Sequence, residues 1–156
     1  MLRSLVGSEM CIRDRNNFQL EPTTVWSFPD RGSWATHSGK YRGNWSPYVP
    51  RNLILRYSKP GEWVLDQFMG SGTTLVEAKL LGRNAVGIDI NPQSVSISET
   101  NLKFQCETKS KIFTKNADAT NLNLSINSLN FPLFSRLPAI ENSIYVSFSL
   151  VFALMG

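Results

Sequence analysis

The feature that most constrains this chain is a glycine-rich turn between an apolar run and a helix-like segment. The apolar run ends at Asp66, the turn contains Gly70 and Gly72, and the helix-like segment follows from Thr74. Strand, turn and helix in this order form the first unit of nucleotide-binding α/β sheets, whose ligands lie at the carboxyl ends of the strands. Glycine at both positions lets the backbone turn sharply and approach a ligand, because no Cβ is in the way. The stretch therefore predicts a binding loop in an α/β protein.

The segment after the turn is expected to form one short, largely buried helix over residues 74–81. Thr74 and Glu77 have the spacing of a capping box, in which the two side chains bond to each other's backbone amides. Gly82 stands where a helix commonly ends on a residue with left-handed backbone.

Two further strands are predicted, and each is followed by an acid. Residues 84–90 form the stronger candidate and contain Asp89, while Asn91 and Pro92 are suited to the cap and first position of the next helix. Asp89 follows Gly70 by 19 residues, close to the spacing at which an acid reaches ribose hydroxyls in the dinucleotide fingerprint. Residues 111–115 form a short, weak candidate strand, and Asp118 comes after it.

Two classes of nucleotide-like ligand compete for such a site. In a nicotinamide dinucleotide site the third glycine of the fingerprint would fall at Leu75, and Asp66 would place negative charge near a pyrophosphate. S-adenosylmethionine carries no phosphate, and a carboxylate can form a hydrogen bond with its amino group, its ribose diol or its adenine amine. The residues therefore favour S-adenosylmethionine.

The run Asp66-Gln67-Phe68-Met69-Gly70-Ser71-Gly72-Thr73 resembles the Asp-x-Phe-x-Gly-Ser-Gly-Thr signature of the amino-directed DNA methyltransferases. Enzymes of this family methylate the exocyclic amine of adenine or cytosine. The resemblance spans residues 24–104, and less closely the residues up to 121. It implies an α/β, Rossmann-like methyltransferase fold with a mostly parallel sheet, which in this chain is expected to be incomplete.

The resemblance also implies the residues that bind the cofactor. Six residues of the signature would line its methionine side: Asp66, Phe68, Gly70, Ser71, Gly72 and Thr73. Asp89 would hold the ribose and Asp118 the adenine. A turn or capping role is the alternative for these two acids.

Residues 16–60 form a basic and aromatic segment. Six cations stand against Glu21 and Asp30, and they are interleaved with tryptophan and tyrosine. The cations are Arg31, Lys40, Arg42, Arg51, Arg56 and Lys59. Cations and aromatic rings suit a phosphate backbone and exposed bases. Alternatively the rings belong to the core and the cations to a solvated face, and composition leaves both interpretations open.

The same resemblance places a cofactor-pocket segment at residues 36–51. Residues 44–50 are expected to wrap the methionine moiety, and residues 52–57 to begin a helix that packs on the sheet. His37 is the sole histidine and lies in a Gly/Ser-rich loop, so it is expected to be solvated. No Cys or His partner lies at metal-ligand spacing from it, and no metal site is predicted.

The catalytic loop of the family, Asp/Asn/Ser-Pro-Pro-aromatic, has no match, because no Pro-Pro dipeptide occurs in the 156 residues. We interpret Ser46-Pro47-Tyr48 as a chance similarity to this loop, since it has one proline and lies in the cofactor-pocket segment. Residues 130–134 match the loop poorly. The catalytic residues therefore stay unknown, and the chain is expected to bind the cofactor without catalysing transfer. Motif order is permuted in this family, so the loop is expected either upstream or downstream of the chain.

The two ends of the chain differ in sequence character from the α/β core expected at residues 61–121. Residues 1–15 resemble a translated sequencing adapter and are excluded as non-native. Residues 122–156 are poor in charge, and they are either native, with a further strand over 144–154, or a frame-shifted end. Cys106 is the only cysteine beyond residue 15, so no internal disulfide is expected and a reducing, cytoplasmic setting is predicted.

We therefore expect a fragment of a DNA methyltransferase from a restriction-modification system, with S-adenosylmethionine as cofactor and DNA as partner. The longest apolar run is too short to cross a membrane, so no membrane association is expected. Two alternatives stay open, an RNA methyltransferase with the same cofactor fold and a non-catalytic nucleic-acid-binding module. The target base, the recognition sequence and the oligomeric state are not determined by the sequence.

Overall fold

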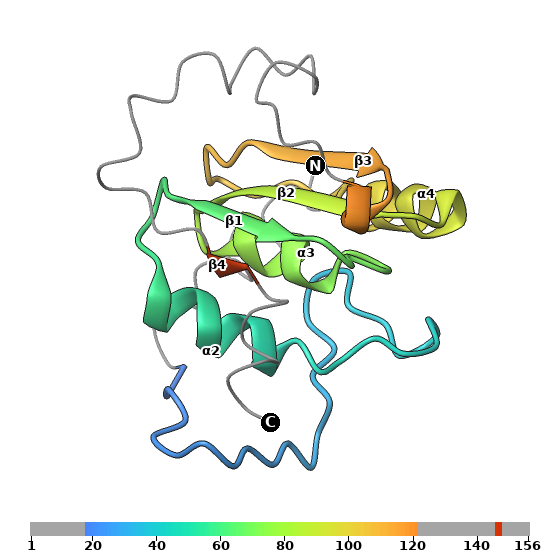
Figure 1. Ribbon diagram of the computed structural model, residues 1–156. Coiled ribbons are helices and arrows are strands. Elements are labelled where there is room, and N and C mark those ends of the chain that lie inside the picture. Colours follow the sequence, from blue (N-terminus) through green and yellow to red (C-terminus); the bar gives the residue numbers. More distant parts are fainter. Residues whose placement is uncertain (1–17, 122–145, 148–156) are drawn as a thin grey trace, which may run out of the picture.

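The centre of the fold is a four-stranded sheet with the order β3-β2-β1-β4 (Figure 1). The computed structural model describes residues 18–121 and 146–147. The strands are β1 (Trp63–Asp66), β2 (Asn84–Asp89), β3 (Ile112–Asn116) and β4 (Val146–Ser147). Every pairing between neighbouring strands is parallel. The predicted α/β fold with a parallel sheet is confirmed.

Helices connect the strands, as parallel pairing requires. Helix α2 (Tyr48–Tyr57) precedes β1, α3 (Thr73–Leu80) joins β1 to β2, and α4 (Pro92–Asn101) joins β2 to β3. A single 3-10 turn, Ala119–Asn121, follows β3. Helix α3 contacts β1 and β2, α4 contacts β2 and β3, and α2 packs against α3.

Strand β1 lies at the point where the strand order reverses. The chain moves from β1 to one side through β2 and β3, and β4 then pairs with the other edge of β1. In open α/β sheets, ligands bind outside the carboxyl ends of the strands at such a point. The carboxyl end of β1 is Asp66, so the topology directs attention to the glycine loop that follows it.

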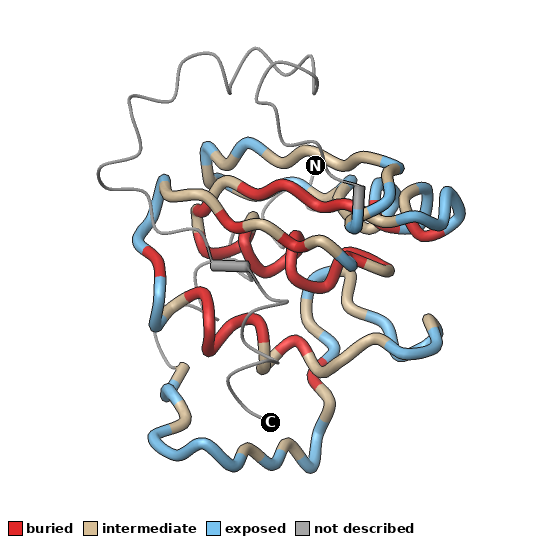
Figure 2. The backbone as a smooth tube through the Cα atoms, in the orientation of Figure 1, coloured by how far each residue is buried: buried red, intermediate tan, exposed pale blue. Residues whose placement is uncertain are grey.

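The core lies between the sheet and helices α2 and α3. Figure 2 shows α3 buried along nearly its whole length. Lys79 is the one residue of this helix that is half-buried. Leu75 and Ile88 are fully buried, and Leu53 and Ile54 of α2 join them in the core. Because α3 is enclosed on several sides, each polar side chain on it needs a partner inside the protein.

Several local predictions agree with the structure. Gly82 has a φ of 77° just after α3, as a left-handed terminating residue should. The Asn91 side chain caps α4 by accepting a hydrogen bond from the Gln93 amide at 3.0 Å, and Pro92 opens that helix. The weak candidate at 111–115 is strand β3, shifted by one residue. Of the strand predicted at 144–154, β4 is the part inside the described residues.

Two predictions about helix starts are wrong. The capping box does not form, because α3 begins at Thr73 with Gly72 as its cap, and Glu77 turns its carboxylate toward other segments. Helix α2 begins at Tyr48, four positions before the predicted start at Asn52. Pro47 stands immediately before it with helical backbone. Proline suits this place because a helix start leaves backbone amides without partners inside the helix, and proline has no amide hydrogen.

Candidate functional site

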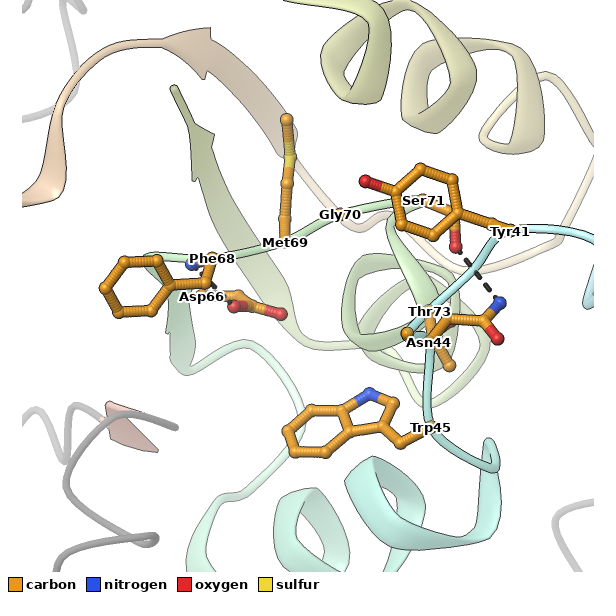
Figure 3. A pocket seen from close by; sticks show the side chains of 10 residues that line it. Tyr41, Asn44, Trp45, Asp66, Phe68, Met69, Gly70, Ser71 and Thr73 are labelled. Atoms are coloured by element: carbon orange, nitrogen blue, oxygen red, sulfur yellow. Dashed lines mark hydrogen bonds between the residues drawn. The ribbon is translucent and has the colours of Figure 1, made fainter. Parts of the chain in front are cut away.

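A hollow of about 390 Å³ opens at the carboxyl end of β1 (Figure 3). The glycine loop and the segment before α2 line it from different sides. The loop contributes Asp66, Phe68, Met69, Gly70, Ser71 and Thr73. The earlier segment contributes Tyr41, Gly43, Asn44 and Trp45, and we call residues 41–45 the wall.

The two glycines of the loop are required by its backbone and by its packing. Gly70 has a φ of 51° and Gly72 a φ of 81°, in the left-handed region that favours glycine. A Cβ on Gly72 would lie 2.3 Å from Ser98 Oγ, and one on Gly70 would lie 3.2 Å from the Tyr41 ring. Gly72 therefore lets the loop press against α4, and Gly70 lets the wall approach the loop.

Asp66 is a buried carboxylate that faces the hollow. It is 5% exposed, and its Oδ1 accepts a hydrogen bond from the Phe68 amide at 3.1 Å (Figure 3). Burial raises the pKa of Asp66, and the nearby charge of Asp89 acts in the same direction. Within residues 18–121, no Lys, Arg or His forms an ion pair with Asp66. A cationic ligand in the hollow would supply the missing partner.

Asp89 lies next to the hollow and holds the glycine loop. Its Oδ2 accepts a hydrogen bond from the Gly70 amide at 2.9 Å, and its Oδ1 accepts one from the Asn91 amide at 2.9 Å. These contacts are the turn role that the sequence left open as an alternative. The predicted contact of Asp89 with a ribose stays a prediction.

Asp118 lies apart from the lining residues, at the 3-10 turn after β3. Its Oδ1 accepts hydrogen bonds from the Thr120 amide at 2.8 Å and the Thr120 hydroxyl at 2.7 Å, and these contacts lower the pKa of Asp118. The side chain is exposed. The predicted contact of Asp118 with adenine stays a prediction. Phe68 lines the hollow, and this residue is 68% exposed.

The wall is tied to the rest of the site by polar contacts. The Tyr41 hydroxyl lies 2.7 Å from Ser94 Oγ on α4, and Asn44 Nδ2 donates to Ser71 Oγ at 3.3 Å (Figure 3). Arg31 donates to the Asn44 side chain and to the Trp45 carbonyl, so it supports the wall from behind.

The structure places only part of the predicted cofactor-pocket segment at the hollow, and its contact with the methionine moiety stays a prediction. Asn44 and Trp45 line the hollow, but residues 48–50, also expected to wrap the ligand, lie in the first turn of α2. Tyr41, Gly43 and Met69 were not singled out as lining residues, although they line the hollow as well. Glycines on both sides of an aromatic residue, at positions 39 and 43, were the available signal for a loop that approaches a ligand.

The prediction that His37 is solvated is wrong. Its side chain is 2% exposed, and Nε2 lies 2.6 Å from Glu77 Oε1. Glu77 is 0% exposed and also accepts hydrogen bonds from Trp34 Nε1 at 2.7 Å and Arg51 Nε at 2.6 Å. A carboxylate inside a protein needs such donors, and the interior position of Glu77 therefore draws the three side chains inward.

Part of the basic and aromatic segment reaches the interior, around Trp34 and Arg51. The Arg51 guanidinium lies 4.6 Å from the centre of the Trp34 ring, and that ring packs edge-on against Tyr48 at 4.9 Å. Lys40, just before the wall, and Arg42, within it, are by contrast exposed. The rings of the Trp34 cluster therefore pack together as the core interpretation expects, and four cations of the segment are exposed: Lys40, Arg42, Arg56 and Lys59.

In the part of the chain that the structure describes, no group of three or more His, Cys, Asp and Glu side chains is placed to bind a metal ion. No helix there is long and apolar enough to cross a bilayer.

Comparison with known proteins identifies the family to which this sheet and loop belong. A family model for N6/N4 enzymes, described as DNA methylase, matches residues 7–100. This chain is a member of the DNA methylase family. The resemblance inferred from the glycine-loop signature is thus confirmed.

Individual relatives agree with the family. Type II methyltransferase M.MjaII of Methanocaldococcus jannaschii is 40% identical over 63 residues, which are 40% of this chain and 12% of that protein. M2.DpnII of Streptococcus pneumoniae is 40% identical over 75 residues, 48% of this chain and 27% of that protein. M.BglI of Bacillus subtilis is 34% identical over 94 residues, 58% of this chain and 26% of that protein. The chain thus spans 12 to 27% of the length of these relatives.

Proposed function

We propose that this chain is the cofactor-binding part of a DNA methyltransferase of a restriction-modification system. The whole enzyme would transfer a methyl group from S-adenosylmethionine to the exocyclic amino group of adenine or cytosine. Membership of the DNA methylase family supports this reaction, and three relatives are named as Type II methyltransferases. The observation that carries the cofactor assignment is Asp66, a buried carboxylate that faces the hollow without a cationic partner among the described residues.

The lining of the hollow suits a cationic adenosine compound. Asp66 would attract its ammonium group, and the rings of Tyr41 and Trp45 would favour positive charge near their faces. The backbone at Gly70 offers a close approach without a side chain. When bound, S-adenosylmethionine would supply an electrophilic methyl group on its sulfonium.

The remaining predicted contacts belong to the same proposal. A carboxylate oxygen accepts more than one hydrogen bond, so Asp89 can hold the Gly70 and Asn91 amides and still bind ribose hydroxyls. Asp118 would accept from the adenine amine with the capacity that remains beside its Thr120 contacts. Ser71 and Thr73, at the beginning of α3, would line the methionine side.

The proposed contribution of these residues to catalysis is positioning. They hold and orient the methyl donor, so that an amine held in line with it needs little further ordering to react. No described residue matches the Pro-Pro loop that holds the target amine in this family. That contribution would come from elsewhere in the whole enzyme.

Titration calorimetry with the purified chain tests the cofactor assignment. We expect S-adenosylmethionine to bind and NAD⁺ to give no signal at the same concentration, because Asp66 would repel a pyrophosphate. The variant Glu107→Gln, which alters an exposed acid outside the hollow, should bind like the wild type. A folded chain that does not bind S-adenosylmethionine would contradict the proposal.

The nucleic acid assignment has its own test. Incubation of the whole enzyme with S-adenosylmethionine that carries a tritiated methyl group, together with DNA or RNA, shows which polymer acquires the label. Label in RNA and none in DNA would contradict the proposal that the substrate is DNA.

A further inference from the structure

Glu77 lies at the junction of three segments that build or adjoin the hollow. Helix α3, which carries it, begins at Thr73 on the edge of the hollow. Trp34 and His37 belong to the segment that leads into the wall, and Arg51 belongs to α2, into which the wall leads. One carboxylate therefore connects both ends of the wall to the helix that starts from the glycine loop.

The contacts of Glu77 are short, buried and charged. Oε1 of Glu77 accepts a hydrogen bond from Trp34 Nε1 at 2.7 Å and lies 2.6 Å from His37 Nε2. Oε2 accepts one from Arg51 Nε at 2.6 Å. Glu77 is 0% exposed and Arg51 is 3% exposed. Hydrogen bonds to ionised groups are about twice as strong as neutral ones, and burial removes competition from water.

The contacts that tie the wall to the glycine loop and to α4 are neutral, whereas the charged contact from Arg31 comes from the same amino-terminal segment as the wall. The Tyr41 hydroxyl meets Ser94 Oγ, and Asn44 Nδ2 donates to Ser71 Oγ. Each of these is a hydrogen bond between uncharged side chains, and the second is long at 3.3 Å. The charged contact that joins α3 to the segments at both ends of the wall therefore lies outside the hollow, at Glu77.

We propose that Glu77 is a positioning residue for the cofactor: it holds the wall at the spacing from the glycine loop that the cofactor requires, without touching the cofactor. This inference rests on the proposed function, because the spacing affects affinity only if the hollow binds S-adenosylmethionine. Glu77 is not among the lining residues.

The variant Glu77→Gln tests the inference, because it keeps the shape of the side chain and removes its charge. At a temperature where circular dichroism shows it folded, S-adenosylmethionine should bind about tenfold more weakly than to the wild type. Amide hydrogen exchange over residues 38–45 should become faster. Both effects follow from a wall that loses its charged anchor.

Lys79→Met is the matched control on the same helix. Lys79 Nζ donates to the carbonyls of Leu102 and Phe104 at 2.8 and 2.7 Å, in the segment after α4. The control should lower thermal stability and speed exchange near residues 102–104, while cofactor affinity stays at the wild-type value. An equal loss of affinity in Lys79→Met would mean that general destabilisation, and not the position of the wall, explains the result.

A milder variant covers the case in which Glu77→Gln does not fold. Trp34→Phe removes one donor to Glu77 and keeps an aromatic ring against Tyr48, so affinity should fall by about threefold. Trp63→Phe, at the amino end of β1 and stacked on Phe113, is its control and should bind normally.

Two results would overturn the inference: wild-type affinity in the folded anchor variants, or unchanged exchange over residues 38–45. Failure of the wild type itself to bind S-adenosylmethionine would instead overturn the proposed function. In that case the exchange experiment still decides whether Glu77 holds the wall.

Discussion

Asp66 and Glu77 are both buried carboxylates, and their surroundings differ sharply. Glu77, in the middle of α3, receives donors from three residues that include Arg51. Asp66, at the end of β1, accepts a hydrogen bond from the Phe68 amide, and no cation among the described residues pairs with it. Burial of a charge is costly unless donors and opposite charge compensate it. The fold itself compensates Glu77, whereas under the proposed function a bound cation would compensate Asp66.

The difference gives a criterion that separates a structural carboxylate from one that we propose binds a ligand. Burial alone does not distinguish them, because Asp66 is 5% exposed and Glu77 is 0% exposed. Their partners distinguish them, because a cation pairs with Glu77 and none among the described residues pairs with Asp66. A variant at Glu77 should therefore affect folding first, and a variant at Asp66 should affect binding first.

The largest expected effect is the loss of stability in Glu77→Ala. Arg51, which is 3% exposed, would keep its charge inside the protein without its partner, so the free energy of unfolding should fall by about 3–5 kcal/mol. Urea denaturation followed by circular dichroism measures this change. The double variant Glu77→Leu with Arg51→Met should recover most of the loss, because neither charge is then buried. If the free energy of unfolding fell by less than about 1 kcal/mol, the Glu77–Arg51 pair would contribute no more than an exposed ion pair does. Glu77 and Asp66 would then not differ in the way described above.

The second effect is the loss of affinity in Asp66→Asn. The variant removes a charge-assisted contact to the ammonium group of S-adenosylmethionine, so affinity should fall by about tenfold to a hundredfold. The free energy of unfolding should be unchanged or higher, because a buried charge without a partner has been removed. Calorimetry and urea denaturation on the same preparation separate the two quantities. Destabilisation as large as that of Glu77→Ala would contradict the binding role.

The smallest effect is a pH dependence of stability. Since burial raises the pKa of Asp66 in the folded protein above its ordinary value of 3.8, ionisation of Asp66 opposes folding. The cost is absent below pH 3.8 and grows as the pH rises through the raised pKa. The stability advantage of Asp66→Asn over the wild type should therefore increase from pH 4 upward and then level off.

Asp118 is the control for this experiment, because its pKa is shifted the other way. The hydrogen bonds from Thr120 lower the pKa of Asp118, so its small stabilising contribution is present above pH 3.8 and disappears as the pH falls through the lowered value. Asp118→Asn should be slightly less stable than the wild type at neutral pH, and the difference should vanish in acid. The same sign of pH dependence for both variants would contradict the assigned causes.

The sequence by itself determined the features that depend on residues close together in the chain. The strand that ends at Asp66, the turn at Gly70, the left-handed residue at Gly82 and the cap at Asn91 all follow from short-range backbone rules. The eight-residue loop signature belongs to the same class, because its glycines must lie at fixed spacing for the backbone to turn. These local features were sufficient to indicate the parallel sheet, the binding loop and the family.

Only the tertiary structure decided which polar side chains are inside and what they meet there. Trp34, His37 and Arg51 reach Glu77 across 43, 40 and 26 positions of the chain. The predicted capping box failed for this reason, since the buried carboxylate gains more from three distant donors than from one amide at the beginning of its own helix. The burial and the partners of a side chain depend on how distant segments pack. The spacing of residues close together in the sequence does not predict that packing.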